Sequence, residues 1–368
     1  MSHETLSELV PIREWGLPFE RFALGAGPCS AESPEQLLAA ARAMKDAGCP
    51  LSFFRTGIWK PRTHPGSFEG HGSRALPWLQ QVRDETGYPV GTEVAEPAHV
   101  RACLDHGVDV LWIGARTTPN PFAVQAIAES LRGVDIPVLI KNPVSPDLGL
   151  WVGAVERLYR AGLRRLAVIH RGFAVAETQQ YRNPPLWRIP IELKRRFPSL
   201  PIICDPSHMC GRVDLIGPVA QEALDLLYEG LMLEVHHDPE HALSDALQQL
   251  TPAQFVELIQ GLELRHEFEP DRQFQTRIHQ LRAEIDQVDE HIMDLLRKRM
   301  DIVQAIGECK RSKEVSTLQP ERWREMIALR MLQGSRLGFS EEFLQQLYGI
   351  IHEEAIQWQE RPLFNGKE

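Results

Sequence analysis

A chain of 368 residues is too long for one typical hydrophobic core, so two domains are expected. Its formal net charge of −10 argues against nucleic acid and anionic membranes as partners. No apolar run approaches the length of a transmembrane helix, the N-terminus lacks the apolar core of a signal peptide, and the six cysteines show no paired spacing. These features predict a cytoplasmic protein with reduced thiols and without a membrane partner.

Short runs rich in β-branched residues alternate with helical patterns from residue 23 to about residue 263. The runs span 23–29, 51–57, 90–96, 109–115, 137–143, 166–172, 201–207 and 231–237. Eight strand–helix units within roughly 240 residues match an α/β fold of the (β/α)8 type, the TIM barrel. An open, doubly wound sheet is the alternative, but the number of units and the lack of a glycine-rich dinucleotide fingerprint favour the barrel. The barrel domain is therefore predicted to occupy residues 1–262.

Every pattern beyond a charged, proline-containing linker at 263–273 is helical. Helices are predicted at 274–312, 320–333 and 340–359, within an all-α domain of residues 274–368. The first helix carries a heptad stripe made of Ile278, Leu281, Ile285, Val288, Ile292, Leu295, Arg299, Ile302, Ile306 and Cys309. Nine of these ten positions are apolar, so the helix is expected to bury the stripe against other helices. We expect the domain to complete its core by pairing with a second copy, which makes the protein at least a dimer.

Arg299 is the cation within the apolar stripe. A buried guanidinium without a partner is very costly, so an anionic group is expected to meet it. Arg282 and Lys310 flank the same face of the helix. Three cations along one helical seam predict a pocket for a small ligand that carries several negative charges.

Polar residues crowd the carboxyl ends of the predicted strands, where the catalytic groups of TIM barrels lie. One set offers a thiol, an imidazole and two carboxylates: Cys29, His208, Glu234 and Asp245. This mixture suits a divalent ion, with Mn²⁺ the first candidate and Fe²⁺, Co²⁺ or Zn²⁺ as alternatives. Taken singly, each residue is better explained as a buried small hydrophobe or a solvated loop residue, but four at one rim favour the metal.

A second set at the same rim is cationic and consists of Arg55, Lys60, Arg62, Arg116, Lys141 and Arg171. Six like charges that converge on one mouth need anions to neutralise them, and guanidinium groups suit phosphates and carboxylates. The barrel is therefore predicted to bind two phosphorylated or carboxylated substrates beside the metal.

Five motifs in this order resemble those of 3-deoxy-D-arabino-heptulosonate 7-phosphate (DAHP) synthase, most closely its type I beta branch. They are GPCS (27–30), KPRT (60–63), IGARTT (113–118), DPSH (205–208) and GLMLEVHHDPEHALSD (230–245). The resemblance runs through residues 23–262 and implies the condensation of phosphoenolpyruvate with erythrose 4-phosphate. It also implies that the four metal ligands are those proposed above.

The same resemblance implies roles for the cations. Phosphoenolpyruvate would be held by Arg55, Arg116, Lys141 and Arg171, and Lys60 would reach the reacting centre. Arg62 and Thr63 would take the phosphate of erythrose 4-phosphate, and Asp205 would contact the aldose hydroxyls.

The segment LRAEIDQVDEHIMDLLRKRMDIVQAIGECK (281–310) resembles the all-helical class of chorismate mutases, and the resemblance continues to the C-terminus. The substrate-binding residues that it implies are Arg282, Arg299, Lys310, Arg322 and Gln359, with Arg282 donated to the partner subunit's site. Lys310 and Gln359 would serve the ether oxygen as chorismate rearranges to prephenate, while the arginines fix the two carboxylates. The chain departs from this family at Gln319, Trp323 and Ala355, where residues that touch the substrate hydroxyl are usual.

Two alternatives remain open. The helical domain could be chiefly a dimerising module that senses prephenate or chorismate with little turnover, and the mutase activity of this domain separates the two readings. The barrel could instead resemble 3-deoxy-octulosonate 8-phosphate synthase, but KPRT argues against it because that branch usually has an Asn-Arg pair there. A barrel kept only as a scaffold conflicts with its intact cationic and metal-binding sets.

Overall fold

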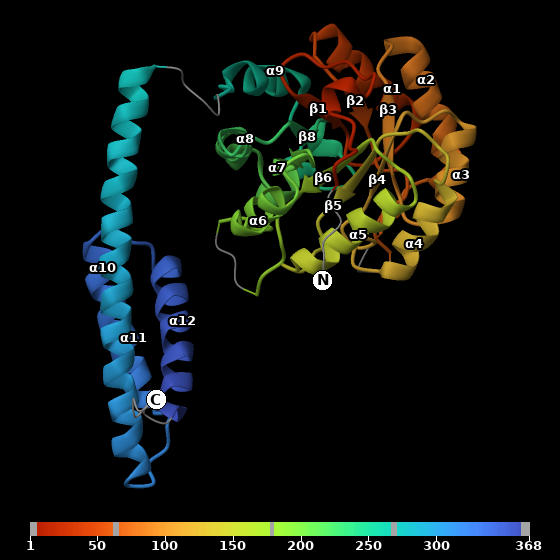
Figure 1. Ribbon diagram of the computed structural model, residues 1–368. Coiled ribbons are helices and arrows are strands. Elements are labelled where there is room, and N and C mark those ends of the chain that lie inside the picture. The colour runs from red at the N-terminus through yellow and green to blue at the C-terminus, as the bar shows by residue number, and fades with distance from the viewer. Residues whose placement is uncertain (1–5, 62–65, 177–179, 266–270, 362–368) are drawn as a thin grey trace. The chain divides into compact units, whose positions relative to one another are not determined.

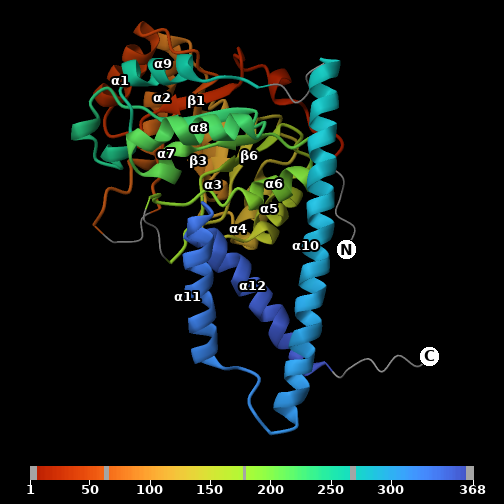
Figure 2. The same cartoon turned by 90° about the vertical axis from the view of Figure 1, so that its left-hand side faces the viewer.

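The computed structural model describes residues 6–61, 66–176, 180–265 and 271–361. It divides into two compact units, residues 1–267 and residues 268–368. The first unit contains all of the strands, and the second is built from helices, as Figures 1 and 2 show. No helix in the described part of the chain combines the length and hydropathy needed to cross a lipid bilayer.

Eight parallel strands close into a barrel in sequence order, with the last strand paired to the first. They are β1 (Ala23–Gly27), β2 (Phe53–Arg55), β3 (Val90–Val94), β4 (Val110–Ile113), β5 (Val138–Lys141), β6 (Leu166–His170), β7 (Ile202–Cys204) and β8 (Gly230–Glu234). The predicted TIM barrel is confirmed, and closure between β1 and β8 excludes the open sheet. The register sets Gly27 of β1 beside Glu234 of β8, so the ends of these strands are neighbours.

Nine α-helices belong to the described part of the barrel unit. They are α1 (Pro34–Asp46), α2 (Leu76–Thr86), α3 (Pro97–Asp105), α4 (Pro121–Ser130), α5 (Leu148–Arg160), α6 (Arg188–Arg196), α7 (Pro206–Cys210), α8 (Ile216–Asp225) and α9 (Pro252–Gly261). Several begin with proline directly after a capping side chain, an arrangement that satisfies the free N–H groups of the first turn. Ser33 caps α1 and Asn120 caps α4 in this way.

Apolar side chains fill the interior of the barrel. Phe53, Trp112 and Met232 belong to this inner cluster, together with Ile12 and Trp15 from the segment that precedes β1. A much larger cluster lies between the strands and the surrounding helices. Because the interior is packed in this way, the carboxyl ends of the strands are where polar side chains can gather.

The second unit consists of three helices: α10 (Arg272–Arg311), α11 (Pro320–Arg336) and α12 (Glu341–Glu360). The predicted helical domain is confirmed, and α12 packs against both α10 and α11. The small core includes Met300, Val303 and Ala355. Gly307 allows α10 and α12 to approach closely, because a Cβ at this position would lie 2.4 Å from the backbone oxygen of Gln359.

Much of the heptad stripe of α10 is exposed in the described part of the chain. Ile285 is 59% exposed and Leu295 is 66% exposed, although both are apolar. The buried residues of α10 are Met300, Val303, Gln304 and Gly307, which lie beyond the N-terminal half of the helix. Burial of the stripe therefore depends on a second copy of the chain and stays a prediction.

Candidate functional site

A pocket opens at the carboxyl ends of the barrel strands. Its lining is Lys60, Pro61, Glu93, Ala115, Arg116, Lys141, Val144, Arg171, Arg182, Asn183, His208 and Asp245. Most of the predicted cations and two of the predicted metal ligands therefore line one pocket. Arg62 and Thr63, which were assigned to the aldose phosphate, lie outside the described residues.

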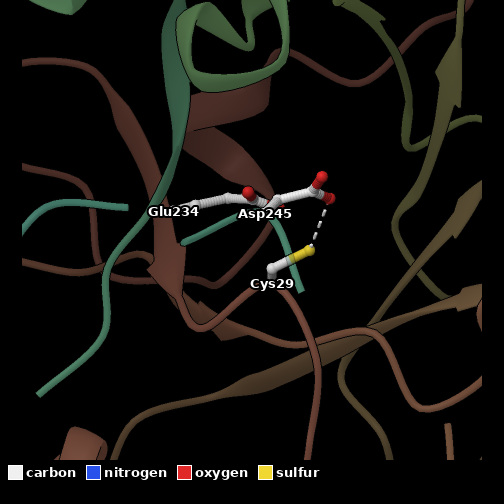
Figure 3. A group of neighbouring side chains, drawn as sticks. All are labelled: Cys29, Glu234 and Asp245. Atoms are coloured by element: carbon white, nitrogen blue, oxygen red, sulfur yellow. Dashed lines mark hydrogen bonds between the residues drawn. The ribbon is translucent and has the colours of Figure 1, made fainter. Parts of the chain in front are cut away.

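Three of the four proposed metal ligands form one cluster, shown in Figure 3. Potential ligand atoms of Cys29, Glu234 and Asp245 all lie within 4.8 Å of one another. Cys29 follows β1 and Glu234 ends β8, so the pairing of these two strands brings them together. The thiol of Cys29 donates to Asp245 Oδ2 at 3.2 Å. His208 is not part of this cluster of three, but its Nε2 lies 3.6 Å from Glu234 Oε1, so it borders the cluster.

The imidazole of His208 is oriented for ligation by the start of α7. Asp205 caps this helix by accepting from the backbone N–H of His208, and its carboxylate also lies 2.8 Å from Nδ1 of the same residue. Since Nδ1–H donates to Asp205, Nε2 is left as the free acceptor that faces Glu234. Burial lowers the pKa of His208 although Asp205 opposes that shift, so the ring is neutral at pH 7, as a metal ligand must be.

The two carboxylates are ionised in spite of their burial. Burial alone would raise the pKa of Asp245, but the positive charge that His208 carries at acidic pH, where Asp245 titrates, and the charge of Arg182 outweigh burial, and the pKa lies below its ordinary value. Burial likewise acts against ionisation of Glu234, where His208 and Arg55 prevail and lower the pKa. A thiol, a neutral imidazole and two carboxylates form a donor set that fits a borderline divalent ion.

Lys60 lies directly against this cluster. Its Nζ is 2.9 Å from the Sγ of Cys29 and 3.0 Å from the carbonyl oxygen of the same residue. Burial raises the pKa of the Cys29 thiol, and the carboxylate of Glu234 adds to this effect. The ammonium group of Lys60 therefore stands at the boundary between the candidate metal ligands and the cationic pocket.

Arg55 lies beneath the pocket and is 2% exposed. Its Nη1 donates to Glu234 Oε1 at 3.0 Å, and its guanidinium carbon lies 5.2 Å from the ring centroid of Trp112. Trp112 is fixed in turn by a 3.0 Å hydrogen bond from its Nε1 to Glu93. Arg55 Nε is buried and has no hydrogen-bond partner among the described residues. Arg55 thus neutralises a candidate metal ligand while it keeps one donor uncommitted.

The remaining cations converge from β4, β5 and β6. Lys141 donates to Asp205 at 3.0 Å, so it is partly neutralised by the chain itself. Burial lowers the pKa of Arg171 to about 10, and the neighbouring cations Arg182 and Arg116 add to this shift. Arg171 remains charged at pH 7. A pocket that concentrates positive charge in this way is suited to phosphate and carboxylate groups.

Arg182 and Gln248 are site residues that the sequence analysis missed. Arg182 lies between β6 and α6, and its Nη1 bonds both Asp245 and Gln248 at 2.9 Å. Gln248 donates to Glu234 at 2.7 Å. Arg182 lies in a loop and Gln248 ends a short 3-10 helix (Ala246–Gln248), both well beyond the ends of the strands, where the sequence carries no signal for them.

The other predicted residues lie in the helical unit. Arg299 Nη1 and Gln359 Oε1 are both buried and have no hydrogen-bond partner in the described part of the chain. Burial lowers the pKa of Arg299, and the nearby Arg330 has the same effect. Lys310 donates to the carbonyl oxygen of Thr317 at 2.7 Å. Each of these two atoms needs a hydrogen-bond partner that a ligand can supply.

Arg282 and Arg322 are not drawn into this group within one chain. Arg282 is exposed and precedes Arg299 by seventeen positions in α10, which corresponds to about 25 Å along the helix axis. Arg322 is exposed and forms an ion pair with Glu325. Trp323, one of the departures from the mutase pattern, stacks on His352 with 4.0 Å between ring centroids.

Comparison with known families assigns both units. Residues 19–267 match the DAHP synthetase I family, and residues 281–360 match chorismate mutase type II. The chain belongs to the DAHP synthetase I family and carries a C-terminal chorismate mutase type II domain. Both enzyme families that the sequence motifs indicated are therefore confirmed.

Individual relatives agree with this assignment. The phospho-2-dehydro-3-deoxyheptonate aldolase of Thermotoga maritima is 33% identical over 242 residues, which are 66% of this chain and 69% of that protein. The 2-dehydro-3-deoxyphosphooctonate aldolase of Rhodopseudomonas palustris is 28% identical over 254 residues, 64% of this chain and 85% of that protein. A crystal structure of the DAHP synthase of Thermotoga maritima aligns with a TM-score of 0.58 at 32% identity, covering 65% of this chain and 67% of that chain.

Proposed function

We propose that the barrel condenses phosphoenolpyruvate with erythrose 4-phosphate to DAHP and phosphate, and that the helical domain rearranges chorismate to prephenate. For the barrel, the carrying observation is that four metal-type donors lie beside a pocket lined by cations. For the helical domain, it is the pair of unsatisfied buried atoms on Arg299 and Gln359.

Cys29, His208, Glu234 and Asp245 would hold one divalent cation, Mn²⁺ in the first place and Fe²⁺, Co²⁺ or Zn²⁺ as alternatives. Such an ion, when bound, polarises an aldehyde carbonyl as a Lewis acid. The bond from His208 Nδ1–H to Asp205 supports this assignment, because it leaves Nε2 free for ligation. Asp205 already accepts from Lys141 and His208, so we assign it to the orientation of His208 in addition to any contact with the aldose.

Arg116, Lys141 and Arg171 would hold the phosphate and carboxylate of phosphoenolpyruvate, with Arg55 below them and Lys60 nearest the reacting centre. Arg62 and Thr63 are assigned to the aldose phosphate through their place in KPRT. The two substrates are anions that repel each other in water. The cations of the pocket would hold them in contact, and this positioning accounts for much of the expected catalysis.

In the helical domain, Arg299 and Arg322 would bind the carboxylates of chorismate, and Lys310 and Gln359 would stabilise charge that grows on the ether oxygen. Arg282 would come from a second copy, a proposal supported by its distance along α10 from Arg299 and by the exposed stripe. The protein would then be at least a dimer.

Both activities are tested by assaying the purified full-length protein with and without EDTA. Synthase activity should disappear with the chelator and return with Mn²⁺, while mutase activity should be unchanged because its proposed site needs no metal. Full synthase activity in a metal-free buffer would contradict the barrel proposal. Absence of mutase activity together with tight prephenate binding would favour the sensing module instead.

A further inference from the structure

The side chain of Arg182 connects both carboxylates of the candidate metal site. Its Nη1 donates to Asp245 Oδ1 and to Gln248 Oε1, each at 2.9 Å. Gln248 then donates from Nε2 to Glu234 Oε2 at 2.7 Å. One guanidinium group therefore contacts Asp245 directly and Glu234 through a single amide.

The hydrogen bonds from Arg182 through Gln248 to Glu234 form a relay, and this relay permits only one orientation of the Gln248 amide. A guanidinium group has donors and no acceptor, so Gln248 must turn its oxygen toward Arg182 and its NH₂ group toward Glu234. Gln248 is 1% exposed, so water cannot readily replace either partner. Arg182 therefore determines which end of Gln248 faces the carboxylate.

The relay also gives the two oxygens of each carboxylate different partners. Asp245 Oδ1 is taken by Arg182, while Oδ2 faces the thiol of Cys29 at 3.2 Å. Glu234 Oε2 is taken by Gln248, while Oε1 lies 3.6 Å from Nε2 of His208. In both residues one oxygen is held by Arg182 or by Gln248, and the other faces a second proposed ligand. In Glu234 this second oxygen, Oε1, also accepts from Arg55 Nη1 at 3.0 Å, so Arg55 and the relay together fix the carboxylate.

We propose that Arg182 is a positioning residue of the metal site, which fixes the oxygen that Asp245 presents directly and the oxygen that Glu234 presents through Gln248. The inference rests on the proposed metal site described above. Groups that hold the outer atoms of metal ligands commonly contribute ten- to a hundredfold in metal affinity. Asp245 also has an unusual backbone conformation, because its φ of 49° lies in the left-handed region and has to be stabilised by surrounding contacts. The hydrogen bond from Arg182 to the Asp245 side chain is one of these contacts.

The test measures metal binding by the metal-free, full-length protein. The variants are Arg182→Met, which keeps the aliphatic stem that lies against Gly211, and Gln248→Met, which keeps the length of the side chain. Arg212→Met is the matched control, since Arg212 forms an exposed ion pair with Asp214. Co²⁺ is the probe, and the readouts are its dissociation constant and the thiolate-to-cobalt absorption band.

We expect the dissociation constant for Co²⁺ to rise ten- to a hundredfold in Arg182→Met and about tenfold in Gln248→Met, with no change in Arg212→Met. The double variant should bind only slightly more weakly than Arg182→Met, because Gln248 acts through the same relay. Arg182→Lys should rescue binding in part, because one ammonium group carries the charge without the planar fork.

Wild-type affinity in Arg182→Met, or an equal loss in Arg212→Met, would overturn the positioning role. Thermal unfolding of each variant shows whether the fold is intact, and Arg182→Lys serves the same comparison if the methionine variant is unstable. Failure of the proposed function gives a different result, since the wild-type protein would then show no thiolate-to-cobalt band at all.

Discussion

The barrel site and the helical domain both carry cations at the predicted substrate-binding positions, but they satisfy those cations in different ways. In the barrel, Arg55 bonds Glu234, Lys141 bonds Asp205 and Arg182 bonds Asp245, all within one chain. In the helical domain, Arg299 Nη1 and Gln359 Oε1 are buried without a partner among the described residues. The barrel site is therefore held together by contacts within one chain, and we expect the helical site to be completed by its ligand and by a second copy.

The difference follows from the two architectures. A closed barrel brings the ends of eight strands to one rim, so residues distant in sequence meet without help from another chain. Three helices bring fewer segments of the chain together, and the stripe of α10 stays exposed over much of its length. The barrel site should therefore respond to changes in its own ligands, and the helical site should respond to ligand and to assembly.

The largest expected effect is a loss of synthase activity that leaves mutase activity unchanged. His208→Ala removes a proposed metal ligand, and loss of Lewis-acid stabilisation worth several kcal/mol corresponds to a fall on the order of a thousandfold in synthase turnover. Mutase turnover should be unchanged. His241→Ala is the control, because His241 is an exposed histidine in the loop that follows β8. Steady-state assays of both reactions decide the matter, and a parallel loss in both would contradict the separation of the sites.

The next effect belongs to the helical domain. Arg299→Leu should reduce mutase turnover by on the order of a hundredfold, because it removes a charged donor from the proposed substrate site. The free energy of unfolding should not fall, since an apolar residue replaces a half-buried cation at an apolar position of the helix.

Mutase kinetics and chemical unfolding of this variant are compared with Arg324→Leu, in which an exposed arginine of α11 is changed. Arg324→Leu should retain full activity. Survival of mutase activity in Arg299→Leu would show that chorismate binds elsewhere.

Much of the fold, and several residues of both candidate sites, could be predicted from the sequence. The barrel strands are buried β-branched runs, and the proposed metal ligands Cys29, His208 and Glu234 stand at or just beyond their ends, where the fold itself dictates proximity. Arg299 was identified because a cation interrupts a heptad pattern, which is a local signal.

The residues that were missed depend on tertiary structure. Arg182 and Gln248 are separated by 66 positions and meet through loop conformations that no periodic pattern encodes. Pairing of the helical domain with a second copy was expected, but how much of the α10 stripe one chain leaves exposed could not be predicted, because a heptad pattern shows that a face needs a partner without showing which segment supplies it. The stacking of Trp323 on His352 is a similar pairwise contact between helices.

A third prediction tests assembly. Ile292 is 47% exposed within the chain, so Ile292→Lys should be tolerated by an isolated subunit but should oppose a paired stripe, where the charge would be buried. Analytical ultracentrifugation should show dissociation. Mutase activity should fall roughly tenfold or more, because the charge-assisted contact from the partner's arginine is lost. Gln287→Lys, on another face of α10, should leave assembly and mutase activity intact; dissociation in this control would show that charge alone is responsible.

The smallest expected effect asks whether the two sites communicate. Prephenate that binds at Arg299 can change synthase activity only if it binds two states of the protein with different affinity. A coupling free energy of about 1 kcal/mol corresponds to roughly fivefold weaker binding of phosphoenolpyruvate when prephenate is bound, and so to inhibition of the synthase at low phosphoenolpyruvate. The inhibition should vanish in Arg299→Leu and persist in Arg324→Leu. Because such coupling is reciprocal, phosphoenolpyruvate should weaken prephenate binding by the same factor, which calorimetry can measure. Inhibition that survived in Arg299→Leu would place the prephenate site outside the helical pocket, and that pocket would then serve the mutase reaction alone.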